Sequence, residues 1–245
     1  MYMSKTVVLI HGYGFDFRSW YPVEVAFEGF HIIYLSLPGF GEEPVENAYT
    51  LEELAHSFWS EIDQNIAPHV HLVGHSMGGY VCMEMIAQQP GRVLSLALIH
   101  SHVFADTEDK KGTRTAAMEN IRANGCLAHA KKMIPSLFDK TSFPDELVQT
   151  LIGRGVAYGD NAWYFGMGAM RDRKDHSETF QNISFPVLMV MGENDIAIPL
   201  DLVYKQAPMV SEGHLHIYPF VGHMAMYENT ARMICDLLVF YNGMK

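Results

Sequence analysis

The chain has 245 residues, of which 49% are hydrophobic and 18% charged, and its mean hydropathy is +0.01. A chain of this length can bury a substantial core, and this composition excludes a disordered, collagen-like or disulfide-dense protein. The formal net charge of −11 would repel a polyanion, which argues against nucleic-acid binding.

The sequence also bears on location and on cysteine chemistry. Its apolar runs fall far short of the roughly 20 residues that a membrane-spanning helix needs. The N-terminal MYMSKTVVLIHGYG lacks the pattern of a secretory signal. We therefore expect a cytoplasmic protein without a membrane span. Cys82, Cys126 and Cys235 show no paired spacing and are predicted to be buried free thiols.

Six short apolar runs, rich in β-branched residues, are typical of strands covered on both faces. They are Thr6 to Ile10, Phe30 to Leu35, Val70 to Gly74, Val93 to Ile99, Pro186 to Met191 and His214 to Tyr218. Helical patterns alternate with them at 49–66, which opens with the capping box Thr50-x-x-Glu53, at 78–89 and at 225–240. This alternation predicts an α/β fold with a mostly parallel sheet.

The stretch from residue 106 to 183 interrupts the alternation with helical patterns and no strand. Helices are expected at 113–124, 126–138, 144–158 and 160–170, between a charged segment, ADTEDKKGT, and a polar one, RDRKDHSETFQN, that suit hinges or surface connections. We interpret residues 106–183 as a helical lid inserted into a core made of residues 1–105 and 184–245.

Gly74-His75-Ser76-Met77-Gly78 matches G-x-S-x-G between an apolar strand and a helix, the context in which this motif forms a nucleophile elbow. The glycines permit the sharp turn that exposes the hydroxyl of Ser76. A serine needs a base and an orienting acid. Asp195 follows the fifth strand and His223 follows the sixth, so they are the candidate acid and base. Glu193 and Asp106 are the alternative acids.

The second oxyanion donor is expected in the loop after the first strand, where His11-Gly12-Tyr13-Gly14 follows TVVLI. The backbone N–H groups of Tyr13 and Met77 are the candidate pair. His11 and His75 are interpreted as structural residues.

These segments resemble the α/β-hydrolase superfamily and, within it, the lidded carboxylesterases. HGYG, GHSMGG, RDRKDH, PVLMVMGENDIAIP and VGHMAMYEN occur in the family's order over nearly the whole chain. The resemblance implies an α/β-hydrolase fold with a sheet of about six strands flanked by helices. It also implies the roles given above for Ser76, Asp195, His223, Tyr13 and Met77.

Two sister activities fit the residues less well. Haloalkane dehalogenases and epoxide hydrolases of this fold carry Asp where Ser76 stands. Carbon–carbon bond hydrolases share the serine triad but usually carry Asn where this chain has His75. Hydrolysis of a carbon–carbon bond, or of a lactone, remains an alternative.

The lid segment 161–170 is rich in aromatic and Met residues, and Trp163, Phe165 and Met167 are expected to line an apolar pocket. The alternative is that they only pack the lid onto the core. Arg154, Arg171 and Arg173 are interpreted mainly as surface ion-pairing residues, although they would suit a substrate carboxylate.

The sequence thus predicts a serine hydrolase that cleaves carboxylic esters of small to medium apolar substrates through an acyl-enzyme on Ser76. Its partner is a small-molecule ester, and the mechanism calls for no metal or cofactor. A ligand sensor without turnover is the alternative of another class, because fold alone does not fix function. The sequence carries no signal for the oligomeric state.

Overall fold

The structure is a computed structural model that describes residues 6–41, 44–65, 67–140 and 145–243. Ile66 and Pro144, at the ends of two expected helices, lie outside the described residues, as do residues 1–5. Six strands form one parallel sheet in the order β2-β1-β3-β4-β5-β6. They are β1 (Thr6–Ile10), β2 (His31–Leu35), β3 (Val70–His75), β4 (Val93–Ile99), β5 (Val187–Gly192) and β6 (Gly213–Tyr218).

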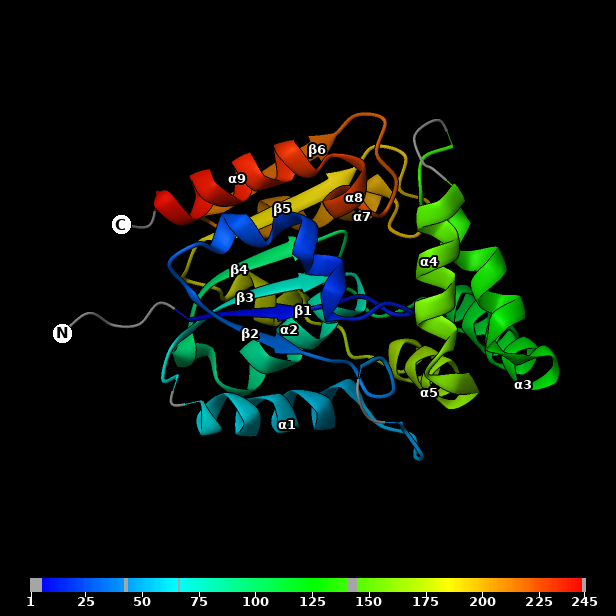
Figure 1. Cartoon of the computed structure of the whole chain (residues 1–245). Helices are drawn as coiled ribbons and strands as arrows, with labels where there is room; N and C mark the ends of the chain where they lie inside the picture. Colours follow the sequence, from blue (N-terminus) through cyan, green and yellow to red (C-terminus); the bar gives the residue numbers. More distant parts are fainter. Residues whose placement is uncertain (1–5, 42–43, 66, 141–144, 244–245) are drawn as a thin grey trace.

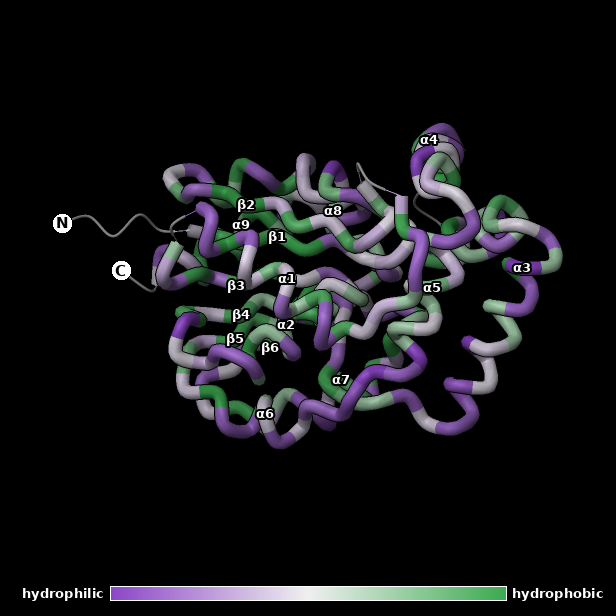
Figure 2. The backbone as a smooth tube through the Cα atoms, turned by 90° about the horizontal axis from the view of Figure 1, so that it is seen from below, coloured by the Kyte–Doolittle hydropathy of each residue, from purple (hydrophilic) through white to green (hydrophobic). Residues whose placement is uncertain are grey.

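The sheet is covered on both faces, as its apolar strands require. The 3-10 segment η1 (Phe17–Phe27) packs against α9 (Thr230–Asn242), and α1 (Leu51–Gln64) packs against α2 (Met77–Gln88). Figure 1 shows these two pairs on opposite sides of the strands. Hydrophobic residues concentrate along the strands in the middle of the molecule (Figure 2), and every residue of β1, β3 and β5 is buried. The predicted α/β fold with a parallel sheet is confirmed.

The capping box predicted at the start of α1 is present. The Thr50 hydroxyl accepts a hydrogen bond from Glu53 N at 3.1 Å, and a Glu53 carboxylate oxygen accepts one from Thr50 N at 2.9 Å. Two backbone donors that the first helical turn leaves free are thereby satisfied. The apolar residues spaced along one face of α1 are buried against the core: Leu51, Leu54, Ala55, Phe58 and Ile62.

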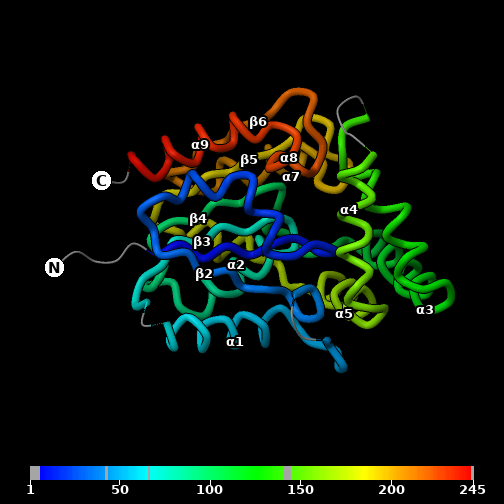
Figure 3. Tube along the Cα trace, in the orientation of Figure 1, coloured from blue at the N-terminus to red at the C-terminus, as the bar shows by residue number. Residues whose placement is uncertain are grey.

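Three helices between β4 and β5 lie together beyond the carboxyl ends of the strands (Figures 1 and 3). They are α3 (Glu108–Ser136), α4 (Asp145–Val156) and α5 (Gly159–Arg171). The break expected within α3 occurs at Gly125, whose φ of 79° and ψ of 161° are not helical. These helices sit over the edge of the sheet at which parallel α/β folds bind their ligands.

The two segments expected to be hinges or surface connections are partly helical. Residues 105–113 are helical from Glu108 onward, because the Thr107 hydroxyl accepts from Lys110 N and two acidic residues occupy the first turn. Within residues 171–182, α6 (Ser177–Gln181) forms a short helix.

The single helix expected at 225–240 is divided at Asn229, whose φ of −144° and ψ of 54° leave the helical region. α8 (Ala225–Glu228) precedes the break and α9 follows it. The Glu228 carboxylate accepts hydrogen bonds from Gly222 N, Met224 N and Asp139 N. Glu228 therefore anchors the loop on either side of His223, which the apolar spacing of a helix does not reveal.

The three cysteines are free thiols that differ in exposure. Cys82 and Cys126 are buried free thiols as predicted, but Cys235 is exposed, because its position on α9 faces away from the sheet. Within the described residues, no helix is both long and apolar enough to cross a bilayer. The remaining elements are η2 (Pro90–Arg92), α7 (Leu200–Gln206) and η3 (Ala207–Met209).

Candidate active site

Ser76 stands at the turn between β3 and α2 in a conformation that few residues other than glycine adopt, with φ 51° and ψ −115°. Two hydrogen bonds hold it there. Ser76 N donates to Ile99 O at 2.9 Å, and the Ser101 hydroxyl donates to Ser76 O at 2.9 Å. Strain of this kind persists only where the surroundings fix the backbone, and it is concentrated at functional sites.

The glycines around this turn allow backbone segments to touch. A Cβ added at Gly74 would lie 2.5 Å from Gly79 N, and one at Gly78 would lie 2.2 Å from Ile10 O. Helix α2 therefore begins directly against the end of β1. This close approach explains the two glycines of the motif physically.

We expect Gly78→Ala to lower the free energy of unfolding by about 3 kcal/mol or more, because the new methyl group meets backbone that cannot rotate away. Gly153→Ala is the matched control. Gly153 is an exposed position of α4 with nothing within 4 Å of an added Cβ, so alanine should raise stability there by up to about 1 kcal/mol. Urea unfolding followed by circular dichroism measures both, and equal stabilities would contradict the clash.

Asp195 and His223 come together at the carboxyl ends of β5 and β6. His223 Nδ1 donates to Asp195 Oδ2 at 2.7 Å. The other carboxylate oxygen, Oδ1, accepts from Ala197 N at 2.9 Å and from Ile198 N at 3.0 Å. His223 N donates to Leu137 O at 2.6 Å, which ties the backbone of His223 to the end of α3. Asp195 and His223 are both buried, so this geometry is fixed from several sides.

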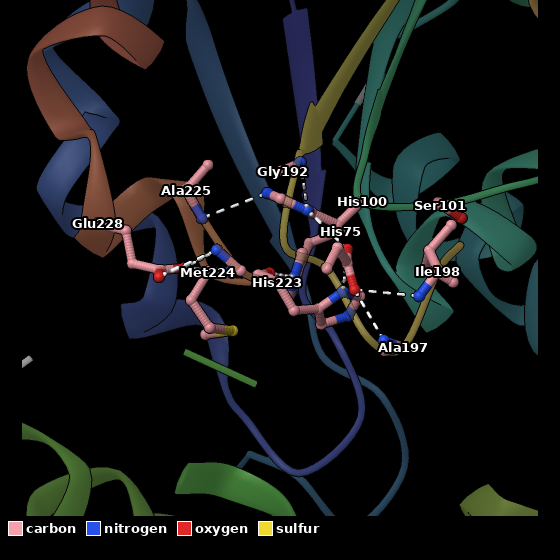
Figure 4. A network of polar contacts seen from close by, with 12 residues as sticks. His75, His100, Ser101, Gly192, Ala197, Ile198, His223, Met224, Ala225 and Glu228 are labelled. Carbon is pink, nitrogen blue, oxygen red and sulfur yellow. Dashed lines mark hydrogen bonds and ion pairs between the residues drawn. The ribbon is translucent and has the colours of Figure 1, made fainter. Parts of the chain in front are cut away.

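His100 is a participant that the sequence analysis missed. Its Nδ1 lies 2.9 Å from the same Asp195 Oδ2, and its Nε2 accepts from Ala225 N at 3.3 Å (Figure 4). Accepting at Nε2 leaves the proton on Nδ1, so His100 donates to the carboxylate. Gly192 N is farther away, 3.4 Å from Nδ1. The signal in the sequence was its place, directly after β4 at the edge where Ser76, Asp195 and His223 also lie.

His75, the residue before Ser76, supports the base through the backbone. Its Nε2 donates to His223 O at 3.0 Å, and the rings of His75 and His223 have centroids 5.0 Å apart. Figure 4 shows His75, His100 and His223 gathered in one cluster. His75 Nδ1 has no hydrogen-bond partner among the described residues.

Burial and charge set the protonation states of this cluster. Burial alone would raise the pKa of Asp195, but the His223 charge and the hydrogen bonds from His100 and His223 outweigh it and hold that pKa well below its usual range. Burial lowers the pKa of His100, partly offset by Asp195. Burial, followed by repulsion from His223 and His100, lowers the pKa of His75 strongly. At neutral pH the site therefore holds an ionised Asp195 beside a neutral His75 and a neutral His100.

Buried neutral histidines make the fold sensitive to acid. Burial lowers the pKa of His11 to about 4 and that of His102 to about 3, whereas an unfolded histidine titrates near 6.5. Between these values the unfolded chain binds more protons than the folded one, so stability falls as pH falls. We expect the free energy of unfolding to decrease by at least about 1.4 kcal/mol per pH unit from pH 6.5 to 4.5.

Urea unfolding at a series of pH values measures that slope. His11→Gln should reduce it, because one buried group no longer titrates. His56→Gln, at an exposed position of α1, is the control and should leave the slope unchanged. A wild-type stability that does not vary over this pH range would contradict the assignment of neutral buried histidines.

The alternative acids lie elsewhere. Glu193 is exposed. Asp106 forms ion pairs with Arg114 and with Arg173 Nη1, the latter at 2.7 Å. Among the three carboxylates that the sequence offered, Asp195 is therefore the one in contact with His223.

The two candidate oxyanion donors flank the nucleophile. Met77 is the first residue of α2, directly after Ser76. The loop after β1 passes close by, since a Cβ added at Gly12 would lie 3.3 Å from Ser76 Cβ. Tyr13 lines the cavity, and its hydroxyl donates to Trp163 O at 2.7 Å, which links this loop to α5.

A cavity of about 130 Å³ opens at Ser76 and His223. Its wall is largely apolar and includes two cations, Lys110 and Arg114, from α3. Besides these cations, Ser76 and His223, the lining residues are Tyr13, Phe15, His75, Tyr80, Met133, Leu137, Met167, Met170, Ala197 and Ile198.

Only one of the three expected substrate-contacting residues of α5, Met167, lines this cavity. Trp163 does not, because its fully buried indole packs against Tyr13 and donates to Gly155 O at 2.9 Å. Phe165 faces a separate cleft beside α1. The expectation for Trp163 and Phe165 is therefore corrected. Phe165 lies two positions from Met167 and so on another face of α5, whereas Trp163 shares the face of Met167 but lies one turn away, where its ring packs against Tyr13.

The arginines weighed for a substrate carboxylate are also outside the cavity. Arg171 pairs with Asp172 at 2.7 Å, and Arg173 is buried against Asp106. Arg154 is half-buried and does not line the cavity either.

His100, Asp195 and His223 also form a group with the composition of a metal site among the described residues, since their ligand atoms lie within 4.8 Å of one another. In this arrangement both Nδ1 atoms and Asp195 Oδ2 are already joined by hydrogen bonds of 2.7 and 2.9 Å. The geometry is that of two imidazoles oriented by one carboxylate.

Comparisons with known proteins agree with this architecture. The chain is 25% identical to a 2-hydroxy-6-oxononadienedioate/2-hydroxy-6-oxononatrienedioate hydrolase of Cupriavidus pinatubonensis, over 96% of this chain and 87% of that protein. A thermophilic esterase from Thermogutta terrifontis superposes with a TM-score of 0.91 at 22% identity, covering 98% and 90% of the two chains. The enol-lactonase of Burkholderia xenovorans gives 0.87 at 19% identity, covering 98% and 92%. The family model for the alpha/beta hydrolase fold matches residues 5–230. The chain therefore belongs to the α/β-hydrolase family, as its sheet order and its strained serine turn independently indicate.

Proposed function

We propose that this hydrolase cleaves carboxylic esters with small to medium apolar acyl chains, using Ser76 as nucleophile. The observation that carries the proposal is the Asp195–His223 hydrogen bond of 2.7 Å, formed beside the strained Ser76 in one shared cavity. A carboxylate that fixes Nδ1–H leaves Nε2 of His223 free to accept a proton.

In the proposed reaction, Ser76 Oγ attacks the ester carbonyl carbon while its proton passes to His223. The N–H groups of Tyr13 and Met77 stabilise the oxyanion, and Asp195 stabilises the imidazolium. Collapse of the intermediate releases the alcohol, which takes the proton from His223. Water, deprotonated by His223, then attacks the acyl group and restores Ser76 with release of the acid.

Covalent labelling tests the assignment of the nucleophile. A fluorophosphonate should form a bond from Ser76 Oγ to phosphorus with loss of fluoride, and mass spectrometry of the digested protein should find the adduct on the peptide that contains Ser76. The same preparation should turn over p-nitrophenyl butyrate until it is labelled. Turnover that survives complete labelling of Ser76, or an adduct on another residue, would refute the proposal.

A second candidate is cleavage of a carbon–carbon bond in a 2-hydroxy-6-oxo dienedioate, the compound that the curated relatives' names give. It is favoured by the similarity to them over 96% of the chain and disfavoured by His75, where such enzymes usually carry Asn. Comparing kcat/KM for 2-hydroxy-6-oxononadienedioate and for p-nitrophenyl butyrate decides between the two candidates. A ratio in favour of the dienedioate would replace the ester proposal.

A further inference from the structure

The cavity at Ser76 carries a charge opposite to that of the whole protein. The chain has a net charge of −11, yet the described residues that line the cavity include Lys110 and Arg114 and no Asp or Glu. A cavity lined by charges of one sign, with low-dielectric walls, concentrates ligands of the other sign. The overall composition of the chain therefore does not explain why two cations line this cavity.

Arg114 is held by an ion pair, but its guanidinium group keeps hydrogen-bond donors available for a ligand. Its Nε donates to Asp106, which also accepts from Arg173 Nη1 at 2.7 Å. One carboxylate shared by two guanidinium groups leaves an excess positive charge. Arg114 Nη1 contacts only the sulfurs of Met167 and Met170, at 3.6 and 3.5 Å, and Nη2 has no hydrogen-bond partner among the described residues. Its outer edge can thus donate to a ligand.

Arg173, by contrast, is buried and donates its hydrogen bonds to other groups of the protein. Its Nε donates to Phe104 O at 3.0 Å, its Nη1 to Met170 O at 2.8 Å, and its side chain is 3% exposed. It holds Asp106 behind Arg114 and does not line the cavity. Arg173 therefore adds positive charge behind the cavity but makes no contact with a ligand inside it.

Lys110, in the first turn of α3, is the second cation. It is exposed, and its ammonium group forms no ion pair within the described part of the chain. Loss of solvation and repulsion from Arg114 lower its pKa, and burial with repulsion from Arg173 lowers the pKa of His102 nearby to about 3. Burial is the larger cause of both shifts, and repulsion from Arg114 and Arg173 adds to it.

We propose that Lys110 and Arg114 bind an ionised carboxylate carried by the substrate, so that the preferred ester is a half-ester of a dicarboxylic acid. The inference rests on the proposed function and narrows it. The remaining wall, with Met133, Leu137 and Ile198, suits the methylene chain between the carboxylate and the ester carbonyl at Ser76. Charge-assisted hydrogen bonds in a partly desolvated site provide the selectivity.

Matched esters test the proposal. The monomethyl esters of succinic, glutaric and adipic acid are compared with the methyl esters of the corresponding monoamides, which have the same shape without the charge. We expect kcat/KM to favour the carboxylate by about 10- to 100-fold for the chain length that fits best. Lys110→Met should bring that ratio down by about 10-fold, mainly through KM.

Lys111→Met is the control, because Lys111 is a neighbouring half-buried lysine that pairs with Glu108 and does not line the cavity. It should retain the wild-type ratio. A wild-type ratio near one, or a ratio that Lys110→Met leaves unchanged, would overturn the carboxylate site while leaving ester hydrolysis intact.

Calorimetric titration with adipate, and with adipamide as its neutral analogue, tests the site without turnover. Adipate should bind the wild type at least about 10-fold more tightly than it binds Lys110→Met. If no ester is cleaved but this difference is found, the reaction assignment fails and the carboxylate site stands. Equal adipate affinities would reject the site whatever the reaction.

Discussion

Ser76→Ala is expected to lower kcat for p-nitrophenyl butyrate by about 10⁴-fold or more, leaving the small rate that binding and the oxyanion donors supply by themselves. The reason is that alanine has no Oγ and therefore cannot form the acyl-enzyme. Stopped-flow measurement of p-nitrophenol release at neutral pH detects the loss.

The fold of this variant should survive, since Ser76 is held by its backbone. Ser76 N and Ser76 O make the hydrogen bonds to Ile99 and Ser101, and neither needs the hydroxyl of Ser76. Ser60→Ala, at an exposed position of α1, is the matched control and should keep full activity. A kcat for Ser76→Ala within 10-fold of the wild type, in a folded protein, would remove Ser76 from the mechanism.

Asp195→Asn is expected to lower kcat by about 10³- to 10⁴-fold while changing the shape of the site very little. Two backbone donors, Ala197 N and Ile198 N, face one oxygen of this side chain. An asparagine must direct its carbonyl oxygen toward them, so its NH₂ group faces His223 and His100. His223 Nδ1 would then have to accept, which moves its proton to Nε2, where it can no longer take the proton of Ser76.

His100 makes the same substitution unfavourable for stability. With the NH₂ group facing its Nδ1, His100 would also have to carry its proton on Nε2. In the wild type this Nε2 accepts a hydrogen bond from Ala225 N. Two donors would then face each other in a buried place, and we expect a loss of about 1–3 kcal/mol in the free energy of unfolding. Kinetics and urea unfolding of the same variant measure the two effects together.

Glu193→Gln is the control for Asp195→Asn, because Glu193 is the exposed acid two residues earlier in the same loop. It should change neither kcat nor stability. If Glu193→Gln, rather than Asp195→Asn, abolished activity, the assignment of the acid would have to move.

The sequence could predict those parts of the fold whose signals are local. The apolar runs located all six strands, because strands covered on both faces need side chains that can be buried on both sides. Thr50 and Glu53 located the start of α1 because a capping box is complete within four residues. The break in the last helix was missed because the helical spacing of apolar residues continues across Asn229, whose backbone leaves the helical region.

The candidate site likewise has parts with local sequence signals and parts without them. By itself the sequence determined the turn at Ser76, and it placed Asp195 and His223 at strand ends, because glycine spacing and the parallel order of strands fix such positions locally. Only the tertiary structure decided that His100 shares the carboxylate of Asp195, that Trp163 packs inward, and that Lys110 and Arg114 face the cavity. The physical reason is that these contacts join segments far apart in the chain, and the direction of a side chain relative to a distant segment depends on how whole elements pack.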